Sequence, residues 1–91
     1  MGHFRQLMQV QNAGRVKLRL KELIEERQGT RNELARTIGA RFEVIDKWCK
    51  DDVEKLDLDV LARICYVLGC DISDILQYER PEENEDKMDG A

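Results

Sequence analysis

The sequence is poor in several residue types, and each shortage excludes a class of protein. Aromatic residues make up 5% of the 91 residues and there is one proline, which argues against a sandwich or barrel with many turns. The chain has one histidine, His3, and its three cysteines form no CxxC pair, so neither a disulfide framework nor a zinc site is expected. We expect the cysteines to be small apolar fillers: Cys49, Cys65 and Cys70.

Long apolar runs and catalytic constellations are also missing. No stretch approaches the roughly 20 apolar residues of a membrane span, and residues 1–14 lack the apolar core of a signal peptide. No Ser-His-Asp set, phosphate-binding glycine loop or paired carboxylates in a plausible pocket occur. We therefore expect a cytoplasmic protein that is not an enzyme, has no cofactor or metal, and does not bind a membrane.

The acidic residues are concentrated at the C-terminus. The formal net charge is −4, and residues 79–91 alone carry it, with six acidic and two basic side chains. The rest of the chain is nearly neutral, so the acidic composition does not exclude binding to DNA, which attracts basic surfaces. We expect residues 79–91 to be a disordered acidic tail and residues 1–14 to be an N-terminal arm, whose order the sequence leaves open.

Residues 15–78 carry the apolar periodicity and the end signals of a helical domain. From Val16 the apolar residues follow a helical period, and Gly29 is expected to end this first helix. Thr30 and Glu33 have the spacing of a capping box, which predicts a second helix that begins there. Gly39 is expected to end that helix after two turns, since glycine adopts the left-handed conformation of a helix C-terminus at little cost.

Three further helices are predicted after this turn. The third starts at about Phe42, the fourth is capped by Asp57 and ended by Gly69, and Asp71 or Ser73 opens a short fifth. Two short helices around a tight glycine turn are the notable arrangement. The fold class is therefore all-α, and the inner face of the third helix is expected to hold Val44, Ile45 and Trp48.

A family resemblance lies in the run GTRNELARTIGARFEVIDKW, followed by DLDVLARICYVLGCDISDIL. These residues resemble the helix-turn-helix of the phage-repressor and Cro class, the Xre family, and particularly its short single-domain members. The resemblance covers residues 16–78 and implies a compact five-helix, lambda-repressor-like domain. It further implies a transcriptional regulator, expected to be a repressor, that binds double-stranded DNA with the second helix on the backbone and the third in the major groove.

The resemblance also implies which residues contact DNA. Arg31 stands where the family usually has glutamine, and Arg41 where it usually has serine. The cations suit phosphate or guanine, the exposed aromatic ring suits a thymine methyl, and the carboxylates suit a cytosine amine. The predicted contact residues are Thr30, Arg31, Arg41, Phe42, Glu43, Asp46, Lys47 and Lys50.

Glu43 and Asp46 leave alternatives open, because unpaired carboxylates are repelled by phosphates. They either read cytosines, or form helix-surface ion pairs with Lys47 and Lys50, or mark a surface that binds DNA poorly. The alternative function is a protein-interaction module, such as an antirepressor, antitoxin or adaptor, whose acidic face or tail binds a basic protein.

We also expect a homodimer. One short helix reads only a few base pairs, which discriminates poorly among the sites of a genome. A dimer surface would lie on the fourth and fifth helices, with Tyr66, Ile75 and Tyr78, or on the N-terminal arm.

Overall fold

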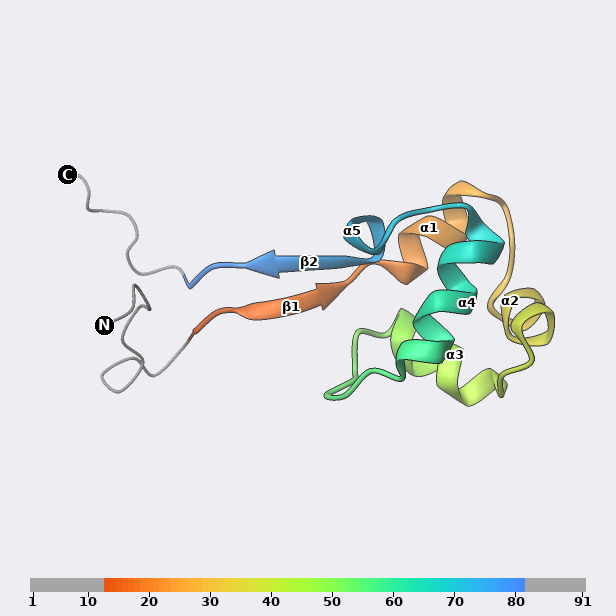
Figure 1. Ribbon diagram of the computed structural model, residues 1–91, viewed down its shortest axis with the longest axis horizontal. Coiled ribbons are helices and arrows are strands. Elements are labelled where there is room, and N and C mark those ends of the chain that lie inside the picture. The colour runs from red at the N-terminus through yellow and green to blue at the C-terminus, as the bar shows by residue number, and fades with distance from the viewer. Residues whose placement is uncertain (1–12, 82–91) are drawn as a thin grey trace. The chain divides into compact units, whose positions relative to one another are not determined.

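The structure, a computed structural model, describes residues 13–81. The predicted arm and acidic tail fall largely outside this range. The elements are β1 (Arg15–Leu18), α1 (Leu20–Glu26), α2 (Arg31–Ile38), α3 (Phe42–Cys49), α4 (Leu58–Leu68), α5 (Ile72–Ile75) and β2 (Leu76–Glu79) (Figure 1). The five predicted helices are confirmed, and a small pair of strands is added to them.

The predicted start of the second helix is confirmed in atomic detail. The Thr30 hydroxyl accepts a hydrogen bond from the backbone N–H of Glu33 at 3.1 Å, and the Glu33 carboxylate accepts one from the N–H of Thr30 at 2.9 Å. At the other end, Gly39 takes the left-handed conformation, with φ of 74°. Local sequence therefore fixes both ends of α2.

The later helix ends also follow their predicted signals. The Asp57 carboxylate accepts hydrogen bonds from two backbone N–H groups of the first turn of α4, at 2.9 and 3.3 Å, and Gly69 ends this helix with φ of 64°. Of the two candidates for the start of α5, Asp71 is the residue that precedes the helix, and Ser73 lies inside it.

Two expectations for the first helix are wrong. Val16 belongs to β1, and α1 begins only at Leu20. Gly29 is not the left-handed residue at the end of α1, because Gln28 takes that conformation, with φ of 59°. The N–H of Gly29 instead donates to the carbonyl of Ile24 at 3.0 Å and closes the turn one residue later.

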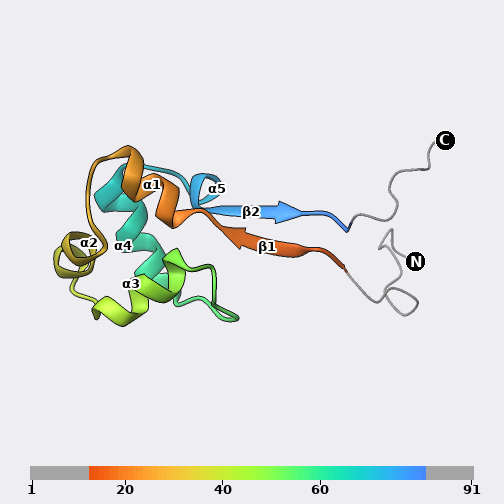
Figure 2. The same cartoon turned by 180° about the vertical axis from the view of Figure 1, so that it is seen from behind.

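The strands β1 and β2 form a two-stranded sheet and run in opposite directions (Figures 1 and 2). The Tyr78 hydroxyl, on β2, donates to the carbonyl of Ala13 at 2.6 Å. Gly14 lies against the other strand with φ of 92°, and a Cβ atom there would come within 2.3 Å of the Glu79 carbonyl oxygen. This close approach requires glycine at position 14.

The helices share one hydrophobic core. Helix α2 packs against α3 and α4, while α1 packs against α3 and α5. The side chains that are completely buried come from four different helices: Leu20, Ile45, Ile64 and Ile75. Because Ile75 is buried inside the domain, its predicted role on a dimer surface is wrong.

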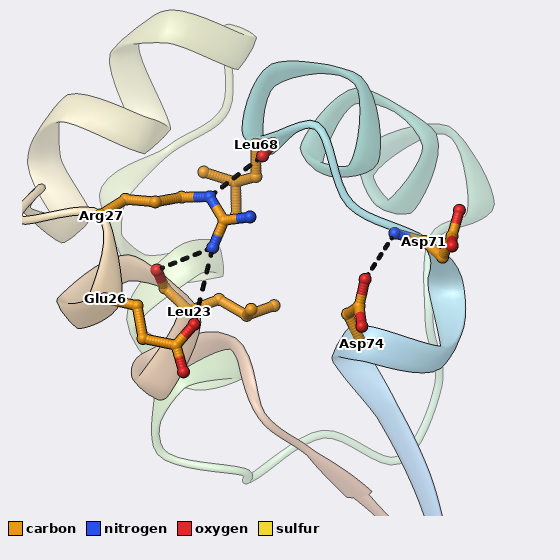
Figure 3. Close-up of polar contacts among 6 residues, drawn as sticks. All are labelled: Leu23, Glu26, Arg27, Leu68, Asp71 and Asp74. Carbon is orange, nitrogen blue, oxygen red and sulfur yellow. Dashed lines mark hydrogen bonds and ion pairs between the residues drawn. The ribbon is translucent and has the colours of Figure 1, made fainter.

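A polar link joins α1 to the end of α4 (Figure 3). Arg27, which follows α1, donates from Nε to the carbonyl of Leu68 at 3.0 Å and from Nη1 to the carbonyl of Leu23 at 3.4 Å. A helix leaves its last carbonyl groups without partners inside the helix, so an arginine is a suitable cap. Arg27 thereby connects the end of α1 to the end of α4.

Candidate nucleic-acid interface

The candidate interface is built on α2, the turn after it, and α3. The backbone N–H of Ala40 donates to the carbonyl of Ala35 at 2.9 Å, which closes the turn that Gly39 makes possible. Arg41 then precedes α3 in an extended conformation, and its side chain makes no capping hydrogen bond. The Arg41 side chain is exposed.

The inner face of α3 is fixed by the core. Ile45 is completely buried and Trp48 is 4% exposed, as the periodicity predicts, whereas Val44 is only partly buried. Cys49 also belongs to this face, and burial raises the pKa of its thiol. The packing leaves the opposite face of α3 at the surface in a fixed orientation.

The outer face of α3 carries the residues that the sequence singles out. Phe42 is a large apolar residue that is nevertheless 42% exposed. Glu43, Lys47 and Lys50 are exposed as well, and their spacing of three and four residues puts them on one side of the helix. Cationic, anionic and aromatic groups therefore share this face.

One carboxylate joins α2 to α3. Arg31 Nη1 donates to Asp46 Oδ1 at 2.6 Å, and Lys50 Nζ lies 2.9 Å from Asp46 Oδ2. The side chains of Arg31 and Asp46 are 31% and 23% exposed. Hydrogen bonds from Lys50 and Arg31 lower the pKa of Asp46, and the bond to Asp46 raises the pKa of Arg31.

Of the two predicted helix-surface ion pairs, only one forms. Asp46 and Lys50 form theirs, whereas Glu43 and Lys47 make no ion pair with any residue of the described range 13–81. Thr30 is exposed, but its hydroxyl is engaged with Glu33 at the start of α2. The structure thus brings Arg31, Asp46 and Lys50 into direct contact.

Comparison with known proteins gives the family. The model of the Cro/C1-type HTH DNA-binding domain matches residues 19–81. The chain belongs to this family. The predicted resemblance to the phage-repressor and Cro class is thereby confirmed.

Two solved structures are similar to this Cro/C1-type chain. A candidate DNA-binding protein from Bacteroides fragilis has a TM-score of 0.62 and 25% identity, and the match covers 69% of this chain and all of that one. The transcriptional regulator VanUg has the same TM-score and 27% identity, and covers 85% of this chain and all of its own. Comparison with the curated proteins gives no match.

The Cro/C1-type domain also contains a supporting residue that sequence reasoning missed. Arg63 of α4 donates from Nη1 to the carbonyl of Ile38 at 2.8 Å and from Nη2 contacts Asp59 at 2.7 Å. It therefore holds the end of α2, next to the turn, against α4. The last carbonyl groups of any helix have no partner inside the helix, so a donor is expected near the end of α2. Nothing in the sequence identifies that donor as a residue 25 positions away.

In residues 13–81 no three side chains among His, Cys, Asp and Glu are grouped so that they could hold a metal ion. No helix in the same range is both long and apolar enough to cross a membrane.

Proposed function

We propose that this protein binds double-stranded DNA in a sequence-specific manner, as a homodimeric transcriptional repressor. The observation that carries the proposal is the construction of α3. Its inner face is anchored by Ile45 and Trp48, and its outer face presents cations and an exposed aromatic ring. A rigid helix with such a face suits the major groove, which is about as wide as a helix.

The proposed contacts divide by chemistry. Thr30 and Arg31 begin α2, where backbone donors and a cation favour a phosphate. On α3, long cations suit phosphate or guanine, the ring of Phe42 suits a thymine methyl, and the exposed Glu43 suits a cytosine amine. The cations of α3 and of its N-terminus are Arg41, Lys47 and Lys50.

The family match and the two similar structures support this proposal. The family model describes a DNA-binding domain, and one of the similar proteins is described as a transcriptional regulator. Transfer of this role to the present chain predicts an operator with two half-sites, about 10 base pairs apart from centre to centre.

The first experiment is selection from a pool of random-sequence duplexes, followed by sequencing of the retained DNA, at low and near-physiological salt. We expect a palindromic motif and a steep loss of affinity with salt, since phosphate contacts release counterions. Retention of no duplex at low salt would contradict the proposal. It would favour the protein-interaction module, because Glu43 would then remain as an exposed carboxylate without a base to bind.

The contact assignment has its own test. Arg41→Ala and Lys47→Ala should each weaken binding to the selected duplex. A lost base contact should cost about 1–3 kcal/mol, whereas a lost phosphate contact should reduce by about 1 the slope of the logarithm of affinity against the logarithm of salt concentration. Thermal stability should change little, because both side chains are exposed. Arg36→Ala is the matched control, since Arg36 is an exposed cation on α2 outside the proposed contact set.

Repression and dimerisation are tested with the selected motif. Transcription from a promoter that overlaps the motif should fall when the protein is present. Sedimentation of the protein with one duplex should give two chains per duplex. A rise in transcription would contradict the repressor role, and one chain per duplex would contradict the dimer.

A further inference from the structure

A carboxylate on a surface proposed to meet DNA needs a physical explanation. Asp46 and Glu43 both lie on the outer part of α3, three residues apart, yet their surroundings differ. Asp46 is partly buried and bonded to cations from two helices, whereas Glu43 is exposed and makes no ion pair within the described residues. The two carboxylates therefore have different roles.

We propose that Asp46 is a positioning residue, which holds Arg31 and Lys50 in the arrangement that contacts the DNA backbone and does not itself read a base. The inference rests on the proposed function, because it concerns how that DNA-binding surface is organised.

The geometry of the carboxylate supports this role. Each oxygen of Asp46 already has a cationic partner, with Arg31 at Oδ1 and Lys50 at Oδ2. A base that approached Asp46 would compete with two charged donors, which form stronger hydrogen bonds than a neutral amine does. The three side chains together carry one net positive charge, so the group as a whole attracts phosphate.

The two cations keep donors for DNA. A guanidinium has five N–H groups and an ammonium has three, and Asp46 engages one nitrogen of each side chain. Long side chains normally lose conformational freedom when they bind, and a side chain that is already held loses less. Asp46 thus neutralises one of the two positive charges and, at the same time, holds the remaining N–H donors of Arg31 and Lys50 in a fixed position.

Arg31 is the residue for which this position matters most. It is the first residue of α2, directly after Thr30, where the backbone N–H groups of the helix start are also directed outward. A phosphate can meet the guanidinium and the helix start together only if the side chain stays near that end. The bond to Asp46 on α3 restrains Arg31 in this way and also joins the two helices of the motif.

The test compares Asp46→Asn with Glu43→Gln, two substitutions that each remove one negative charge from the same helix. Binding is measured to the selected duplex and to random-sequence duplex of equal length. Random-sequence binding is mainly electrostatic and does not need the fixed register that positioned phosphate contacts give on an operator, so both variants should bind that duplex at least as tightly as the wild type. On the selected duplex, Asp46→Asn should lose about five- to tenfold in affinity, near the lower end of the effect of one lost contact, and should select the same motif as the wild type. Glu43→Gln, at a proposed base contact, should instead change the selected motif at one base pair.

Each other outcome overturns the inference in a recognisable way. Unchanged binding of Asp46→Asn to the selected duplex would mean that Asp46 does not position its two cations for DNA, and tighter binding would mean that it is only a repulsive charge. Selection with Asp46→Asn that yields a motif changed at one base pair would mean that Asp46 reads a base. Equal losses on both duplexes would mean that Asp46 supports the fold and does not set the arrangement that an operator needs. Failure of the wild type to bind any duplex would instead reject the proposed function itself.

Discussion

Arg41 is one residue at which stability and the proposed DNA binding are expected to oppose each other. It precedes α3 with φ of −74° and ψ of 149°, a conformation typical of a helix N-cap, but its side chain makes no capping bond. A serine here would accept a hydrogen bond from the first turn of α3. The arginine cannot accept this hydrogen bond, and it places a long cation at the start of α3, the helix proposed to read bases in the major groove (the proposed reading helix).

Arg41→Ser should therefore stabilise the fold and weaken DNA binding. We expect a gain of about 0.5–2 kcal/mol in the free energy of unfolding, the usual effect of a good N-cap, with lower affinity for the selected duplex. Urea denaturation and a binding titration measure the two effects. Arg41→Ala is the control, because it removes the cation without adding a cap and should lower only the affinity. A serine variant no more stable than the alanine variant would contradict the capping argument.

At the scale of elements, the sequence predicts the helix ends well and the strands poorly. A capping box or a left-handed glycine acts within a few residues, so Thr30 and Gly39 mark α2 from the sequence alone. The strands are four residues each, and their partners lie about 60 residues apart in the chain, as the 65-residue separation of Tyr78 and Ala13 illustrates. No local pattern reports such a pairing.

The tie between α2 and α3 should weaken in acid. The pKa of Asp46 is lower in the folded protein because Lys50 and Arg31 bond to the charged carboxylate. A depressed pKa contributes stability above the unfolded value, near 3.9 for aspartate, and this contribution is lost as the pH falls through the folded value. The wild type should thus exceed Asp46→Asn in stability at pH 5–7, and the difference should shrink below about pH 4.

Urea denaturation of both proteins over this pH range measures the difference. Lys50→Met is a useful companion, since it leaves the Arg31 bond in place and should retain part of the pH dependence. An advantage of the wild type that grows toward acid would contradict stabilisation by the bonds to the charged carboxylate.

At the scale of the whole molecule, the sequence predicts the core and the family but not the contacts between elements. Trp48 and Ile45 are correctly predicted on the inner face of α3, since a single helix already defines that face. The bond between Arg31 and Asp46 joins residues 15 apart, on helices whose crossing the sequence does not specify. The same reason explains why the sequence predicts Ile75 at a surface although the packing of α1 against α5 buries it.

One core predicts one unfolding transition for the helical domain. Trp48 is the single tryptophan and lies on α3, so its fluorescence reports the packing of the proposed reading helix, while circular dichroism reports all the helices. Ile64→Val on α4 removes one buried methylene, which costs about 0.5–1.5 kcal/mol. Both signals should move together to a melting temperature lower by several degrees, since about 4–8 °C corresponds to 1 kcal/mol in a domain of this size.

Val67→Ala on the same helix is the control, because Val67 is 41% exposed and alanine favours helix formation. It removes more atoms than Ile64→Val and should nevertheless change the melting temperature less. If circular dichroism shifted in Ile64→Val while the fluorescence transition stayed in place, α3 would unfold separately from α4. The orientation of α3 would then depend on α2 and the turn, and the shared core would not hold α3 rigidly for DNA.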